Sequence, residues 1–364
     1  MELDFKGKGL TVVLLTLVPQ NLEALGSALA TRLIFGMPWT LCLAQGYTLG
    51  AVSPAVLVPS MMILHNAGYG TAKGIPTTLI AASSFDDIIA ITVFAVFLKI
   101  SLNTANGGVD EGGSIWVEVG LNVVQILGGF VAGYGLGWCM RIFNRCKGDK
   151  IGTKFVLTTF IAIATPFICN LGGFPEAKFV FIIFYGYQCY MQWGEAKPEH
   201  ELGVFWMFCQ PFLFGTVGAA VQFEKITPSV IGFAFAVILI GVTFRWLGTI
   251  VAAFEKKYTC KERAFMAFAW IPKATVQAAL GAMTLAEATK RDPALEDYDQ
   301  WITWGEEMLT TAVFAVCLTA PLGAIMINTL GTKWLNYDGV KDTERDDKEA
   351  LTGGELSGKV LPEV

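Results

Sequence analysis

The chain has 364 residues, of which 54% are hydrophobic and only 16% are charged, and its formal net charge is −5. Soluble domains carry about 25% charged residues, so this composition excludes an ordinary soluble enzyme, and the acidic balance argues against a nucleic-acid partner. Apolar segments long enough to cross a ~30 Å hydrocarbon core recur along the sequence. We count ten, at 11–32, 38–63, 75–98, 115–142, 153–170, 175–193, 202–223, 228–254, 263–286 and 303–330. The predicted fold class is therefore an all-α polytopic membrane protein with about ten transmembrane helices.

Lysine and arginine are distributed unevenly between the predicted loops. If the N-terminus is cytosolic, most of them fall in cytosolic loops, which agrees with the positive-inside rule. Residues 331–364 are rich in charge, glycine and threonine, and this predicts a disordered cytosolic tail. A multi-pass chain of this kind fits either a plasma membrane or an intracellular organelle membrane.

Two adjacent aspartates, Asp86 and Asp87, interrupt the apolar run 74–99. An ionised carboxylate in hydrocarbon costs about 2.5–3.5 kcal/mol even on the mildest insertion scale, so it needs a water-filled cavity, a partner charge or a proton. Neighbouring residues on a helix point ~100° apart, so at least one of the two faces the protein interior. We therefore predict an ion or proton site. The alternative is a structural pair bonded to serine or threonine hydroxyls.

Three more ionisable residues, Glu23, Arg245 and Lys273, interrupt other apolar segments. Opposite charges in the membrane can neutralise one another, and we predict that Glu23 and Arg245 form a pair. That pair either stabilises the helices or takes part directly in proton transport. Lys273 either compensates the negative end of a broken helix or carries a proton.

The order of these residues contains a hidden repeat. Near the N-terminus, Glu23 is followed by a segment with a central Ser53-Pro54 and then by the aspartate segment; later, Arg245 is followed by Pro272-Lys273 and a final segment. An interior proline removes a helix hydrogen bond, and such breaks at membrane depth are tolerated where the backbone lines a cavity. Paired broken helices in inverted repeats are typical of secondary transporters.

At these residues the chain resembles the NHA branch of sodium/proton exchangers, within the cation:proton antiporter superfamily. The similarity is carried by residues 50–62 (GAVSPAVLVPSMM), 81–92 (AASSFDDIIAIT) and 268–281 (FAWIPKATVQAALG), and 19–39 also match. The resemblance implies a homodimer in a lipid bilayer, in which a mobile core domain slides against a dimerisation scaffold. The core of such proteins has two crossed broken helices, here those with Pro54 and Pro272.

The resemblance also implies roles for individual residues and a division of the chain. The ion-site aspartates correspond to Asp86 and Asp87, with Asp87 as the main ligand; the glutamate–arginine pair corresponds to Glu23 and Arg245, and the broken-helix lysine to Lys273. The expected domains are a first core triplet (1–99), a linker helix and scaffold (100–225), a second core triplet (226–330) and the tail (331–364). Family members begin with further helices, so we expect the chain as given to insert but to transport poorly.

The chemistry of the site can be argued from the residues alone. Na⁺ is a hard cation that prefers oxygen ligands, so Asp87, Asp86 and the Ser53 hydroxyl are the predicted ligands. For Ser53 the alternative is a local hydrogen bond at the helix break. Protons compete with Na⁺ for the same oxygens, and competition at one site that faces alternate sides is exchange. The predicted function is antiport of Na⁺ or Li⁺ against H⁺, with no enzymatic activity and no cofactor besides these transported ions.

Two other functional classes compete with an antiporter. An intramembrane aspartyl protease needs its carboxylates on separate helices that flank the peptide, which neighbouring residues cannot do. A channel-like or non-transporting homologue is the remaining alternative, and it would differ by having no obligatory proton counterflow.

Overall fold

The computed structural model describes residues 9–105, 114–144, 150–175, 177–194, 197–219, 228–255 and 257–339. Within these ranges the chain is almost entirely helical and forms no β-strand, so the predicted all-α class is confirmed. The helices are α1 (Gly9–Phe35), α2 (Trp39–Gly50), α3 (Pro54–Asn66), α4 (Ile75–Ala105), α5 (Ser114–Cys139), α6 (Lys150–Leu171), α7 (Ala177–Gln192), α8 (Glu199–Ala219), α9 (Pro228–Ala252), α10 (Cys260–Ala269), α11 (Thr275–Thr289) and α12 (Tyr298–Trp334), with a short 3₁₀ helix at Met140–Asn144.

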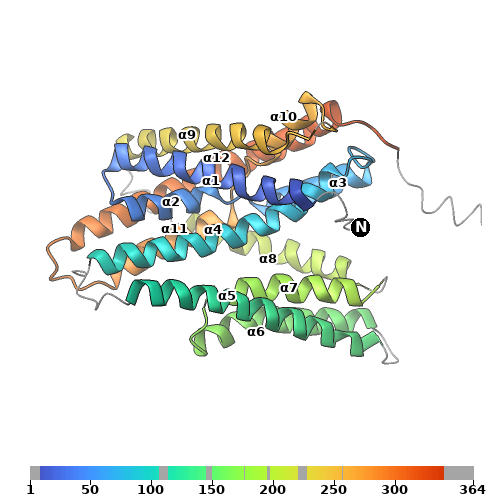
Figure 1. Ribbon diagram of the computed structural model, residues 1–364, viewed down its shortest axis with the longest axis horizontal. Helices are drawn as coiled ribbons and strands as arrows, with labels where there is room; N and C mark the ends of the chain where they lie inside the picture. Colours follow the sequence, from blue (N-terminus) through green and yellow to red (C-terminus); the bar gives the residue numbers. More distant parts are fainter. Residues whose placement is uncertain are drawn as a thin grey trace, which may run out of the picture.

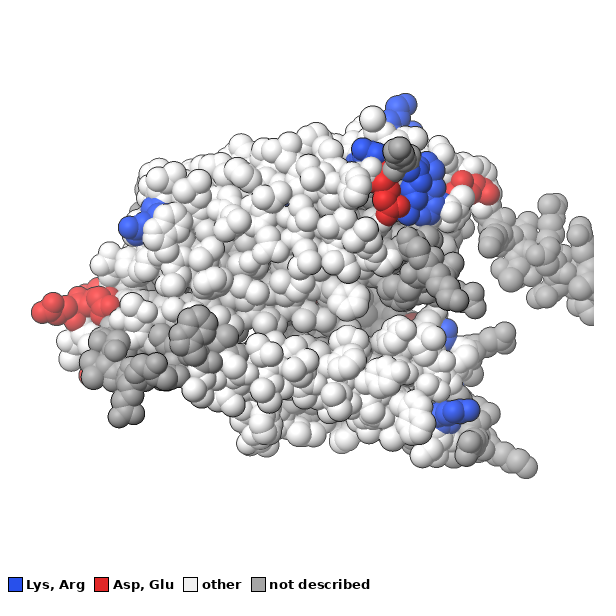
Figure 2. All heavy atoms as spheres, in the orientation of Figure 1, with Lys and Arg blue, Asp and Glu red and all other residues white. Residues whose placement is uncertain are grey.

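Every predicted apolar segment overlaps a helix or a pair of short helices. Of the described chain, seven helical segments are long and apolar enough to cross a membrane. The count of ten crossings stays a prediction, because α7 has only 16 residues and the segment from α10 to α11 is divided into helices of 10 and 15 residues. On the face in Figure 2, the charged side chains gather near the two ends of the long axis and leave an uncharged band between them.

The helices form two groups that lie side by side (Figure 1). In the larger group α1 packs against α2, α4 and α9, and α12 packs against α9, α10 and α11. In the smaller group α5 lies along α7, with α6 beside them. Buried apolar side chains from α1, α2, α4, α11 and α12 fill one core cluster of the larger group. The predicted domain boundaries at residues 99 and 225 stay a prediction.

Two helices are interrupted where the sequence predicts a break. Residues 51–53 separate α2 from α3, and residues 270–274 separate α10 from α11. Pro54 is the first residue of α3, a position where its missing N–H breaks no helical bond. The backbone N–H of Ser53 donates to the carbonyl oxygen of Pro272 over 2.8 Å, so the two breaks lie against each other. Gly323 of α12 makes this possible, because a Cβ there would overlap the Pro272 ring.

The segment after α12 is bonded to the turn between α3 and α4. Tyr69 and Tyr337 form an antiparallel β-bridge, and their rings meet edge to face. The Asp338 backbone N–H donates to the carbonyl oxygen of Gly68 over 2.8 Å, and its carboxylate accepts from the backbone N–H of Ala72, also over 2.8 Å. The tail predicted to begin at residue 331 is therefore ordered as far as Gly339, and residues 340–364 lie outside the described part.

The crossing of α1 and α2 offers a test of this packing. A Cβ at Gly46 would overlap the carbonyl oxygen of Ala24, which is backbone and cannot rotate away. Gly46→Ala should therefore lower the free energy of unfolding by about 1–3 kcal/mol, the usual cost of overpacking. The measurement is thermal unfolding of the purified protein in detergent. Gly232→Ala on α9 is the matched control, because no atom lies within 4 Å of its added Cβ. Equal midpoints for the two variants would contradict the close crossing.

Candidate functional site

Glu23 lies on the face of α1 that packs against α9. Small residues bring these helices together: a Cβ at Gly248 would lie 3.0 Å from the Cα of Pro19. This proximity lets Arg245 of α9 reach Glu23, and its Nη1 lies 2.7 Å from Oε2 of the carboxylate. Both side chains are almost fully buried, with 0% and 1% of their surface exposed. The structure thus brings together the two residues that the sequence predicts as a pair.

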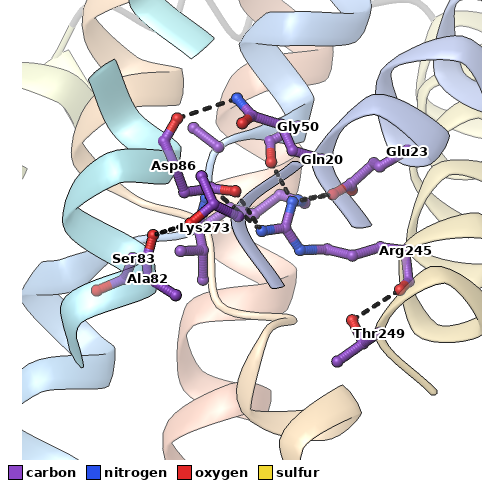
Figure 3. A network of polar contacts seen from close by, with 12 residues as sticks. Gln20, Glu23, Gly50, Ala82, Ser83, Asp86, Arg245, Thr249 and Lys273 are labelled. Atoms are coloured by element: carbon purple, nitrogen blue, oxygen red, sulfur yellow. Dashed lines mark hydrogen bonds and ion pairs between the residues drawn. The ribbon is translucent and has the colours of Figure 1, made fainter. Parts of the chain in front are cut away.

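The Arg245 guanidinium also contacts the helix that carries the aspartates (Figure 3). Its Nη2 lies 3.2 Å from both carboxylate oxygens of Asp86, and its Nη1 also donates to the carbonyl oxygen of Gly50 at the end of α2. The ring of Trp270 covers the guanidinium carbon at 5.5 Å from the ring centroid. Arg245 therefore contacts α1, α2 and α4 at one point. The sequence predicted its contact with Glu23 of α1 but not its contacts with α2 and α4.

Lys273 lies in the break before α11 and completes this group. Its Nζ is 2.6 Å from Oε1 of Glu23, and the lysine is 1% exposed. Its backbone N–H donates to the hydroxyl of Thr319 on α12 over 3.0 Å. The group, hereafter the charge network, contains two carboxylates (Glu23 and Asp86) and two cations (Arg245 and Lys273), so its formal charges cancel. Pairing with an opposite charge offsets part of the cost of burying each of these groups.

Asp86 is held by more than the arginine. The backbone N–H of Val52, in the break between α2 and α3, donates to its Oδ2 over 2.8 Å. The Gln20 amide of α1 donates to the backbone carbonyl of Asp86 over 3.0 Å. Asp86 is fully buried. Its carboxylate therefore has a fixed position against both the first helix break and the charge network.

Asp87 has different surroundings. Its partly buried side chain lines a cavity of about 280 Å³ between α4, α7 and α11. The rest of the wall is almost entirely apolar, and Thr275 supplies the one hydroxyl among the lining side chains. Within the described ranges, Oδ1 of Asp87 is buried and accepts no hydrogen bond, and no lysine or arginine pairs with this carboxylate. The adjacent acids thus differ: Asp86 is compensated, whereas Asp87 keeps a free oxygen beside a cavity.

Ser53 is the last of the predicted ligands. It immediately precedes α3 and is 1% exposed. Its hydroxyl makes no hydrogen bond within the described part of the chain, and it does not cap α3. The expectation of a local bond at the helix break is therefore not met, and the hydroxyl oxygen is left with unused bonding capacity.

The sequence matches the model of a known family, described as sodium/hydrogen exchanger, transmembrane, over residues 4–333. The chain belongs to this family. Sodium/hydrogen exchanger 9B2 from Homo sapiens is 36% identical over 352 residues, which cover 96% of this chain and 62% of that protein. Sodium/hydrogen exchanger 9B1 from Homo sapiens is 33% identical over 326 residues, 88% of this chain and 60% of the relative. The chain thus spans about three fifths of the length of these curated relatives.

The fold also resembles a solved structure, that of the sodium proton antiporter MjNhaP1 from Methanocaldococcus jannaschii at pH 8. The TM-score is 0.65 at 18% sequence identity, and the match covers 91% of this chain and 80% of the other. Family membership and the apolar helices together identify an integral, multi-pass membrane protein.

The sequence predicted one pair, Glu23 with Arg245, whereas the structure places four of the predicted residues in one network. It also shows further residues that contact this network or the first helix break. Glu23, Arg245, Lys273 and Asp86 share one network, and Asp87 lies beside it. Sequence reasoning missed Gln20, Trp270 and Gln277, the last of which donates to two backbone carbonyls of the first break. The available signal was a polar side chain within an apolar run, which is much weaker for an uncharged amide than for a charge.

The charge network predicts a specific pattern of stability. Arg245→Gln should lower the free energy of unfolding by about 3–5 kcal/mol, because it leaves buried carboxylates without their cation. The double variant Glu23→Gln/Arg245→Gln should recover part of that loss, since the charges that remain, those of Asp86 and Lys273, then balance again. Chemical unfolding of Glu23→Gln, Arg245→Gln and the double variant measures this. Lys290→Gln, which breaks the exposed pair with Glu287, is the control and should cost only about 0–1 kcal/mol. Strict additivity of the two single losses would contradict the coupling.

Proposed function

We propose that the protein exchanges Na⁺ or Li⁺ for H⁺ across its membrane, with Asp87 as the carboxylate that binds the ion and the proton in turn. The observation that carries this proposal is the contrast between the aspartates. Asp86 is bonded to a guanidinium, whereas Asp87 has a free buried oxygen at the wall of a cavity. Membership of the sodium/hydrogen exchanger family supports the same chemistry.

The ion site would use oxygen ligands only. Na⁺ is a hard cation, and the Asp87 carboxylate and the Ser53 hydroxyl offer oxygens without partners in the described structure. Asp86 adds a carboxylate whose charge is already compensated by Arg245. A proton and Na⁺ then compete for Asp87.

The charge balance suggests the stoichiometry. The charge network is formally neutral, so the carboxylate of Asp87 is the one uncompensated charge in this group of ionisable residues. One negative charge accepts either one monovalent cation or one proton. We therefore propose one-for-one, electroneutral exchange.

Access to the two sides would alternate by movement of the larger helix group against the smaller one. The cavity beside Asp87 lies at this boundary, with Ile88 and Ile91 of α4 on one side and Phe179, Ile182 and Ile183 of α7 on the other. Sites between two helix bundles that rock about a fixed centre are typical of secondary transporters. We also propose, on the resemblance to the family, that the working unit is a homodimer in the bilayer, for which chemical cross-linking in membranes is the test.

Exchange in liposomes tests the proposal. Asp87→Asn keeps the shape of the side chain but removes the charge, so it should abolish the Na⁺-driven or Li⁺-driven pH change. Asp86→Asn should weaken exchange less, because this carboxylate is compensated rather than free. Asp299→Asn, at an exposed position near the start of α12, is the matched control and should exchange like the unmodified protein. Proton movement above background in Asp87→Asn would overturn the assignment. Cation flux without counterflow of protons in the unmodified protein would indicate a channel instead.

A further inference from the structure

The last turn of α2 ends in carbonyl groups that the helix cannot satisfy. A break at membrane depth leaves such groups without water, and each needs another donor. Gln277, in the first turns of α11, supplies two. Its Nε2 donates to the carbonyl oxygens of Thr48 over 3.1 Å and of Ala51 over 2.6 Å. Gln277 is fully buried. One side chain from the second broken helix therefore caps the first.

One of these carbonyls belongs to the peptide group that holds Asp86. The Ala51 carbonyl and the Val52 N–H are the two ends of a single planar unit. Gln277 binds the carbonyl end over 2.6 Å, and Asp86 Oδ2 accepts from the N–H end over 2.8 Å. Because the unit is rigid, a bond that fixes its carbonyl also fixes the direction of its N–H. The amide of Gln277 thus determines where the Val52 donor points.

A glutamine is the residue that this position requires. Its NH₂ group carries two donors on one uncharged atom, which matches two carbonyl acceptors. A glutamate offers at most one donor, and only when it is protonated; a lysine would add a positive charge beside a network that is already neutral. Gln277 also lies four residues after Lys273, so the same short segment delivers a cation to Glu23 and an amide to the first break.

We propose that Gln277 is a positioning residue for cation exchange, which acts through the Ala51–Val52 peptide on Asp86. This inference rests on the proposed exchange function. Gln277 does not contact the ion; it holds the peptide whose N–H directs the Asp86 carboxylate toward Arg245. Without that bond, the Asp86 carboxylate, which the proposed ion site also uses, loses its fixed position beside Asp87, and Na⁺ binds more weakly.

The principal variant is Gln277→Leu, which keeps the approximate volume and removes both donors. The half-saturating Na⁺ concentration for exchange in liposomes should rise about tenfold, the size expected for loss of one buried hydrogen bond. The maximal rate per folded protein should change little, because the ion ligands are intact. Hydrogen–deuterium exchange of the amides in residues 48–56 should accelerate, since the Val52 and Ser53 bonds lose their fixed geometry.

Gln45→Leu on α2 is the matched control. Gln45 is another buried glutamine, and within the described chain both of its amide atoms are without partners. The same change of chemistry there breaks no bond to the first break, so neither the half-saturating Na⁺ concentration nor the amide exchange of residues 48–56 should change.

Gln277→Glu provides a second readout within a single preparation. A glutamate can donate to the Ala51 carbonyl only while it is protonated. Exchange by this variant, relative to the unmodified protein, should therefore fall as the pH rises. Because the pH dependence is measured within one folded sample of each protein, this result decides the matter even if Gln277→Leu does not fold.

The outcomes separate the inference from the function on which it rests. Two results for Gln277→Leu would overturn the role of Gln277 while exchange itself stands. One is an unchanged half-saturating Na⁺ concentration. The other is an exchange rate that falls only as much as the amount of folded protein, with unchanged amide exchange of residues 48–56. A pH profile of Gln277→Glu parallel to that of the unmodified protein does the same. If the unmodified protein shows no exchange, the proposed function fails, and the amide exchange of residues 48–56 alone then decides whether Gln277 holds the break.

Discussion

The structure depends on the mutual neutralisation of four charges in a place without water. Arg245 is the centre of this group, because it contacts both Glu23 and Asp86, while Lys273 contacts Glu23 from the opposite side. These residues come from α1, α4, α9 and the break before α11, and none of them would be stable at that depth alone. The larger helix group is therefore stable only in the arrangement that compensates its charges.

The helix breaks follow from the same constraint. The hydrocarbon core holds no water that could bond a free backbone N–H or C=O group. A broken helix is therefore stable there only if other residues form hydrogen bonds with its ends. Here Arg245 and Gln277 bind carbonyls at the end of α2, and Asp86 accepts from the N–H of Val52. Side chains of the charge network, together with Gln277, thus also replace the missing helical bonds. The crossing of the two breaks therefore depends on the charge network.

The sequence predicted much of this and could not predict the rest, for physical reasons. Apolar runs and prolines locate helices and breaks because length and the missing N–H are local properties. The buried charges are conspicuous because each is costly, so Glu23 and Arg245 were paired correctly in space. Their contacts join residues about 160 to 220 positions apart, and no local pattern indicates that Asp86 and Lys273 share the same group. An uncharged amide such as Gln277 gives almost no signal, because its cost depends on partners that only the fold supplies.

The bond between the end of α12 and the turn before α4 has a mechanical consequence. Asp338 and Tyr337 are bonded to residues 68–72, and α4 begins only three residues later, at Ile75. Tension on the chain beyond Gly339 therefore reaches this turn first, by a path shorter than the one through α12. A displacement of residues 337–338 would therefore act directly on the start of α4, the helix that carries both aspartates.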